Sequence, residues 1–224
     1  WPRAAGDRLP ETPGGAALAL ADRLDAIVGC FGVGLVPTGS EDPYGLRRAA
    51  QGVVQILLRR DARLSLDEAV RQAQAAYGAA AGAHAGGARR EVLDFLRART
   101  QALLLERGLP PEVVEAVLSA GSDDVGDARR RAEALALMRR EADFAELCVA
   151  FRRVVGIIPK GFDRPVEVQR LVEGAERALH AQAAELRDEV GRLTAAREFL
   201  GALRRIAALK PVVVDEGVTD VERM

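Results

Sequence analysis

Apolar residues recur at intervals of three and four along most of this chain, and this spacing restricts it to helices. Such spacing gathers apolar side chains on one face of an α-helix, whereas a strand needs alternation by two. Alternation is absent apart from the short run Val212–Val214. The sequence therefore predicts an all-α protein. The first helix, expected over about 15–33, shows the pattern at Leu18, Ala21, Leu24, Ile27, Val28 and Phe31.

Capping residues mark where further helices begin. Asp42 stands before Pro43, which predicts an N-cap followed by proline at the first helical position. Ser65 and Glu68 have the spacing of a capping box. We therefore expect helices over about 43–60, 65–80, 89–107, 111–120, 125–140, 143–157, 166–192 and 195–209.

Small residues fill positions 81–88, and this stretch predicts a domain boundary. The chain has 224 residues, enough for two helical domains with real cores. We expect one domain over residues 1–85 and a second over residues 88–224.

Composition excludes several classes of function. The formal net charge is −1, so attraction to nucleic acid has to come from local basic patches. Aromatic residues make up 4% of the chain, which disfavours base stacking as the main mode of RNA binding. No apolar run is long enough to cross a membrane, and no signal peptide opens the chain. We expect a cytoplasmic protein with no membrane partner and, because it begins at Trp1, a fragment of a longer one.

Catalytic and metal-binding signatures are missing from the sequence. Cys30 and Cys148 stand far apart, and His84 and His180 stand alone among alanines. Neither pair has the spacing of a zinc site or of a nucleophile with its base. We therefore expect no catalytic residue and no metal ligand in this chain.

Two segments resemble the glycyl-tRNA synthetase beta subunit of bacteria. Residues 19–29 read Ala-Leu-Ala-Asp-Arg-Leu-Asp-Ala-Ile-Val-Gly, and residues 37–50 read Pro-Thr-Gly-Ser-Glu-Asp-Pro-Tyr-Gly-Leu-Arg-Arg-Ala-Ala. Both are similar to that family's LADKLDTLVG and PTGSKDPFALRRAA signatures. Glu41 departs from the pattern by replacing a lysine, which reverses a charge.

Weaker similarities to the same family follow in the expected order. Residues 95–108, 131–135 and 151–158 resemble helices of its C-terminal anticodon-binding domain, and residues 209–211 resemble a turn near its end. The resemblance covers nearly the whole chain but only about the C-terminal third of a complete beta subunit. The tail departs from the family after residue 211, which would leave the domain without its last helix.

The resemblance implies a fold, a function and partners. Residues 1–85 would be the end of an HD-like helical domain, and residues 88–224 a DALR-type anticodon-binding helical domain. The chain would be a tRNA-binding, non-catalytic part of glycine-tRNA ligase, with glycine tRNA and an alpha subunit as partners in a heterotetramer. ATP and Mg would be used by that alpha subunit, with no cofactor in this chain.

One candidate RNA-binding site surrounds the loop before the second predicted helix. Backbone N–H groups at a helix N-terminus, with the hydroxyls of Thr38 and Ser40, can hold a phosphate. Arg47 and Arg48 follow one turn later, and arginine suits phosphate because its planar fork donates two hydrogen bonds. The alternative is a structural loop whose arginines pair with Asp42 or neighbouring carboxylates.

A second candidate site is the clearest basic cluster of the second domain. Its residues could hold an anticodon stem-loop, where exposed bases are read. The alternative is a solvent-exposed charged face with the phenylalanine in the core. The candidate residues are Arg152, Arg153, Lys160, Phe162 and Arg164.

Two further functions compete with RNA binding. A helical scaffold for subunit assembly would need no free basic patch. A degenerate HD-type phosphohydrolase would use Asp22, but no histidine precedes His84 to complete a metal site. We interpret Asp22 as a surface or capping carboxylate beside an arginine. The arginines at positions 129–131 and 139–140 are expected to pair along the helix with neighbouring acidic residues, including Asp127.

Overall fold

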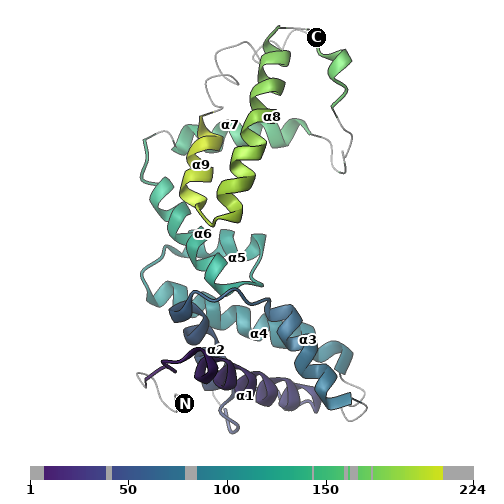
Figure 1. The fold of residues 1–224 in the computed structure, drawn as a ribbon, viewed down its shortest axis with the longest axis vertical. Helices are drawn as coiled ribbons and strands as arrows, with labels where there is room; N and C mark the ends of the chain where they lie inside the picture. Colours follow the sequence, from purple (N-terminus) through teal and green to yellow (C-terminus); the bar gives the residue numbers. More distant parts are fainter. Residues whose placement is uncertain are drawn as a thin grey trace. The chain divides into compact units, whose positions relative to one another are not determined.

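The part of the chain that the computed structural model describes consists of α-helices and connecting loops, with the short 3-10 helix η2 among them and no strand (Figure 1). This confirms the all-α prediction. The helices are α1 (Pro13–Gly32), α2 (Leu46–Arg60), α3 (Leu66–Tyr77), α4 (Ala85–Glu106), α5 (Pro111–Ala120), α6 (Val125–Met138), α7 (Phe144–Ile157), η2 (Val168–Arg170), α8 (Gly174–Ala195) and α9 (Phe199–Ala207). The described residues are 8–38, 42–78, 85–142, 144–158, 161, 166–172 and 174–208.

The chain forms two compact units, residues 1–132 and residues 133–224, and the boundary between them falls within α6. Helix α4, which begins at the expected domain boundary, packs against α1, α2 and α3. The first compact unit therefore extends well beyond residue 85. Compact units are defined by contacts and family domains by sequence, so the boundary between family domains at residues 85–88 stays a prediction.

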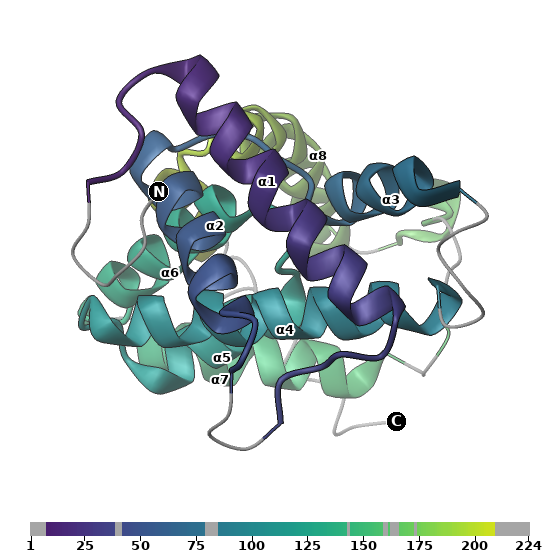
Figure 2. The same ribbon diagram turned by 90° about the horizontal axis from the view of Figure 1, so that it is seen from below.

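Helix α1 lies across the core of the first unit. Figure 2 shows it crossing α4, with α2 and α3 on either side, and α1 packs against all three. Phe31 of α1 and Phe95 of α4 stack at a tilt with ring centroids 5.3 Å apart. Burying large apolar side chains is the main source of stability for such a core. The largest fully buried ones include Ile27, Ile56, Leu57, Leu96 and Leu104.

Local capping explains why several helices begin where the sequence predicts. The hydroxyl of Ser65 accepts a hydrogen bond from the backbone N–H of Glu68 at 3.1 Å, which is the serine half of a capping box, while the Glu68 carboxylate accepts from Arg71 and Gln72. Thr12 caps α1 in the same way, by accepting from the N–H of Gly15. Pro111 stands in the first turn of α5, where its missing N–H costs nothing.

Four predicted helix starts differ from the structure by three residues or more, and two of these are α4, which begins at Ala85 rather than at about 89, and α9, which begins at Phe199 rather than at about 195. Helix α2 begins at Leu46 rather than at Pro43, because Gly45 adopts a left-handed backbone with φ of 68° and interrupts the turn. Helix α8 begins at Gly174 rather than directly after Pro165. The carboxylate of Glu176 accepts the N–H of Val172 at 2.9 Å and ends the extended segment there.

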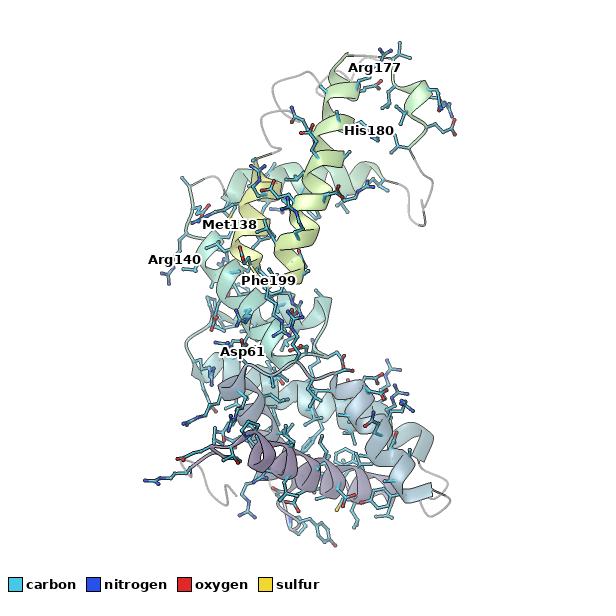
Figure 3. All side chains as sticks on the ribbon, viewed as in Figure 1. Asp61, Met138, Arg140, Arg177, His180 and Phe199 are labelled. Carbon is cyan, nitrogen blue, oxygen red and sulfur yellow. The ribbon has the colours of Figure 1, made fainter. Side chains whose placement is uncertain are left out.

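A polar junction joins the loop between α2 and α3 to the start of α6, and we call it the α2–α6 junction. The carbonyl of Asp123 accepts the N–H of Leu66 at 3.0 Å, and its carboxylate accepts the N–H of Asp67 at 2.8 Å. Asp61, labelled in Figure 3, accepts hydrogen bonds from Arg129 and Arg130 of α6. Backbone groups between the helices are thus satisfied inside the protein rather than by solvent.

The second unit is held partly by ion pairs. Helices α8 and α9 pack against each other, and Arg205 of α9 pairs with Glu189 of α8 at 2.6 Å. Arg204 pairs with Glu141 at 2.8 Å. All four side chains are more than a quarter exposed, so each pair contributes little to stability. Apolar packing in this unit includes Ala202, which is buried.

Candidate functional site

The first candidate site is built on a helix start that the protein already caps. The carboxylate of Asp42 accepts the N–H of Leu46 at 2.7 Å and the N–H of Arg47 at 3.1 Å. These are the donors that a phosphate at this helix end would use. A phosphate would therefore have to displace the Asp42 carboxylate and overcome its charge.

The side chains expected around this loop are only partly brought together. Thr38 is exposed, and Ser40 lies outside the described residues. Arg47 is half-buried, whereas Arg48 is exposed and folds back over Gly45, with its Nη2 3.1 Å from the place a Cβ would take. The structural alternative, in which Asp42 organises the loop, thus accounts for the backbone N–H groups, while Arg48 remains accessible to a ligand.

A cavity of about 170 Å³ lies beside the same loop. Pockets that hold small ligands usually measure about 300–1,000 Å³. This one is therefore suited to a few waters rather than a nucleotide. Its lining includes Leu35, Val36, Thr38 and Tyr44.

The second candidate site is described only in part. Arg152 is exposed on α7, and its Nε donates to the carbonyl oxygen of Cys148 at 3.4 Å. Among the described residues no carboxylate forms an ion pair with Arg152. The side chain of Arg153 and the whole of Lys160, Phe162 and Arg164 lie outside the described part of the structure.

Sequence reasoning missed one residue beside this cluster. Phe151 is 64% exposed, in contrast to Phe31, which is 2% exposed in the core of the first unit. The helical periodicity gives no signal for this, because an apolar residue at a helical interval is normally assigned to the core. The only hint in the sequence is that Phe151 precedes two arginines.

The arginines of α6 pair both within the helix and outside it. Arg131 bonds to Asp127 one turn earlier at 2.7 Å, which confirms the expected intrahelical pair. Arg129 and Arg130 also bond to Asp61 at the end of α2. Hydrogen bonds from Arg130, followed by those from Arg129, hold the pKa of Asp61 down at about 2. The sequence pattern could not show this partner, because Asp61 is far away along the chain.

Asp22 lies exposed on α1, at the edge of a cavity of about 710 Å³. Its neighbour Arg23 is buried, and burial lowers the pKa of that guanidinium while the charge of Asp22 opposes the shift. No group of three or more His, Cys, Asp or Glu side chains able to hold a metal occurs among the residues that the structure describes.

Comparison with known families decides where the chain belongs. Residues 1–119, which include the loop around Asp42 and the buried Arg23, match the family model described as Glycyl-tRNA synthetase beta subunit. The chain belongs to this family.

Curated members of the glycyl-tRNA synthetase beta subunit family match almost the entire chain. The glycine--tRNA ligase beta subunit of Geobacter sulfurreducens is 44% identical over 214 residues, 96% of this chain. Those of Anaeromyxobacter dehalogenans and Moorella thermoacetica are 44% and 39% identical over 95% and 94% of the chain. This chain spans 31% of the length of these three relatives, so it is a fragment relative to them.

In this member of the family, the signature residues of α1 have structural roles. Arg23 donates from Nη1 to the carbonyl of Ala19 at 2.8 Å and packs over Gly52 of α2. Tyr77 of α3 packs over Gly29 and donates to the carbonyl of Asp25 at 3.0 Å. Both glycines thus permit a close approach between helices.

None of the helices traced in the described residues is both long and apolar enough to pass through a bilayer.

Proposed function

We propose that this chain is a tRNA-binding, non-catalytic part of glycine-tRNA ligase. The observation that carries the proposal is the identity of 44% with a glycine--tRNA ligase beta subunit across 96% of the chain. Because the match covers 96% of the chain, it includes residues of both compact units and is not limited to a pair of helices. In this role the chain supports the ATP-dependent attachment of glycine to its tRNA in the cytoplasm.

The proposed division of labour assigns the chemistry to another subunit. An alpha subunit would hold ATP, Mg and glycine, and the two kinds of subunit would form a heterotetramer. This chain would supply contacts to glycine tRNA and need no cofactor of its own. The proposed domains are the end of an HD-like domain over residues 1–85 and an anticodon-binding domain over residues 88–224.

Arg152 is the best-supported RNA contact among the described residues. It is exposed, it has no carboxylate partner among those residues, and it belongs to the basic cluster of the second candidate site. An exposed arginine without a carboxylate partner can donate directly to a phosphate, whereas an arginine held by a carboxylate must first lose that partner. The loop around Thr38 and Arg48 is the weaker candidate for an RNA contact, because the Asp42 carboxylate already accepts the N–H groups of the adjacent helix end.

A scaffolding function is the second candidate, and one feature of the first unit favours it. Leu18 is 73% exposed on α1 and lines the cavity of about 710 Å³ together with Leu9 and Pro10. An exposed apolar patch beside an open cavity is typical of a surface that packs against another part of an assembly. RNA binding and scaffolding use different surfaces and do not exclude each other.

A degenerate HD-type phosphohydrolase is the third and weakest reading. Asp22 lies at the edge of the cavity of about 710 Å³, an accessible position that an active-site carboxylate would need. The family match, however, is to a synthetase subunit rather than to a hydrolase. Hydrolysis of a phosphate ester by this chain on addition of divalent metal would support the phosphohydrolase function.

The experiment that tests the proposal compares two RNAs. Binding of the purified chain is measured with glycine tRNA and with the same tRNA carrying a swapped anticodon, at one fixed salt concentration. Tighter binding to the correct anticodon is expected. Equal weak binding to both would leave a general backbone contact or a scaffold, and no binding at all would reject the tRNA-binding function.

A further inference from the structure

Phe151 lies in an unusual position for a large aromatic residue. It is 64% exposed on α7, although phenylalanine is among the residue types most often buried. Val155 and Ile158, which follow at intervals of four and three, are 51% and 50% exposed. The three side chains therefore share one accessible face of the helix and its end.

Positive charge adjoins this face. Arg152 is exposed next to Phe151, and among the described residues no carboxylate pairs with it. From Leu147 to Lys160 every charged residue in the sequence is basic, so no acidic residue of this segment would repel an anion. The face thus combines an accessible aromatic ring with a cationic rim.

We propose that Phe151 is a stacking platform for an unpaired RNA base, and that Arg152 binds a phosphate next to that base. The inference rests on the proposed tRNA-binding function and specifies a contact within it. An unpaired nucleotide offers a flat π-face and a negative charge a few ångströms apart, and consecutive residues of α7 present an exposed ring and an exposed guanidinium on adjoining sides of the helix. Stacking on an aromatic ring is tolerant of base identity, so this contact adds affinity rather than specificity.

A single-stranded RNA fits this surface better than a double helix or a protein. The bases of a duplex are already stacked and hidden from a side chain on a helix surface. A protein partner would need an acidic patch around an apolar centre, and any aliphatic residue at position 151 would serve it as well as a ring. A variant that keeps an apolar side chain at position 151 but loses the ring therefore distinguishes RNA from protein.

The first test measures affinity for the anticodon stem-loop of glycine tRNA and for the whole tRNA. Phe151→Leu, which keeps an apolar side chain but removes the ring, is expected to weaken binding by about 5-fold to 150-fold. Phe151→Tyr, which keeps the ring, is expected to stay within about twofold of the unchanged chain. Val172→Ala, at another exposed apolar position of the same unit, is the matched control and should have no effect.

Each outcome of this test separates the two proposals. If the unchanged chain binds the tRNA and Phe151→Leu binds equally well, the stacking contact is rejected and the tRNA-binding function stands. If the unchanged chain binds no tRNA, the tRNA-binding function itself fails. A loss with Phe162→Leu but not with Phe151→Leu would move the platform to Phe162 and overturn the inference.

A spectroscopic test reports stacking directly. Trp1 is the single tryptophan of the chain, so Trp1→Phe combined with Phe151→Trp places one indole at the proposed contact. Stacking of a base on that indole is expected to quench its fluorescence in a saturable manner as the stem-loop is added. Unchanged fluorescence at a saturating concentration of RNA, with binding confirmed by an independent method, would overturn the inference.

Discussion

Asp61 at the C-terminal end of α2 accepts a hydrogen bond from Arg130 of α6, with 3.1 Å between Nε and Oδ1, although the two residues are 69 positions apart in the chain (Figure 3). Arg129 donates to the same carboxylate at 3.1 Å. One acidic side chain therefore holds two arginines of the α2–α6 junction. It does so from a left-handed backbone, with φ of 49°.

Asp61→Asn is expected to destabilise the first unit at neutral pH. The pKa of Asp61 is lowered from 3.8 to about 2 in the folded chain, so the carboxylate stabilises the fold above pH 3.8. That contribution is lost as the pH falls towards 2. Asparagine tolerates the left-handed backbone, so the substitution removes the charge and one acceptor oxygen without adding backbone strain. We expect a loss of about 1 kcal/mol, after allowing for solvent screening of a side chain that is 31% exposed.

Urea unfolding at a series of pH values measures this effect. The difference between Asp61→Asn and the unchanged chain should be greatest near neutral pH and shrink below pH 3.8. Asp94→Asn, at an exposed position of α4, serves as the control and should change stability little. A difference that does not vary with pH would show that the charge of Asp61 is unimportant.

Gly52→Ala is expected to destabilise the chain, against the usual trend for a helix. Alanine in place of a helical glycine normally stabilises by about 0.5–1 kcal/mol. A Cβ at Gly52 would lie 2.6 Å from the Nε of Arg23, which is only 7% exposed and cannot move aside freely. Overpacking of this kind costs about 1–3 kcal/mol.

Gly191→Ala provides the matched control for this prediction. Gly191 also lies within a helix, but nothing is within 4 Å of the place its Cβ would take. The control should therefore raise the free energy of unfolding while Gly52→Ala lowers it. Opposite signs in thermal or urea unfolding would support the contact, and equal stabilisation by both substitutions would contradict it.

Asp42→Ala is expected to weaken the start of α2. The substitution leaves the N–H groups of Leu46 and Arg47 without their carboxylate partner, and loss of such a cap costs about 0.5–2 kcal/mol. Thermal unfolding measures the loss. Ser65→Ala removes the hydroxyl that caps α3 and should lower the free energy of unfolding by a similar amount. It therefore serves as the reference for the loss of one helix cap. If Asp42→Ala also increased affinity for tRNA, the freed helix end would be a phosphate site after all.

Local rules predicted much of the fold. The capping box at Ser65 and the proline at Pro111 fix their helix starts through contacts within one turn, and a sequence shows such contacts directly. The start of α2 was missed because the Asp42 carboxylate caps it from outside the helix while Gly45 breaks the turn. Spacing alone does not distinguish that arrangement from a helix beginning at Pro43.

The candidate sites were harder to predict than the fold. The sequence located the basic cluster around Arg152, because charge can be counted along a chain. It could not show that Phe151 is exposed, since exposure depends on what packs against α7. Nor could it show that Arg129 and Arg130 hold Asp61, because the sequence gives no long-range partner for a charge.

Replacing Arg152 and Arg153 together by alanine is expected to weaken tRNA binding by at least about tenfold, since hydrogen bonds to charged groups are the strong ones. Each lost phosphate contact should also flatten the dependence of log affinity on log salt by about 0.7 for single-stranded RNA. Arg187→Ala with Arg192→Ala removes the same charge from exposed positions of α8 and controls for net charge. A titration at several salt concentrations measures both quantities. Equal losses in the two double variants would mean that the effect is one of overall charge, whereas a flatter slope only at 152 and 153 would place the phosphate contacts on α7.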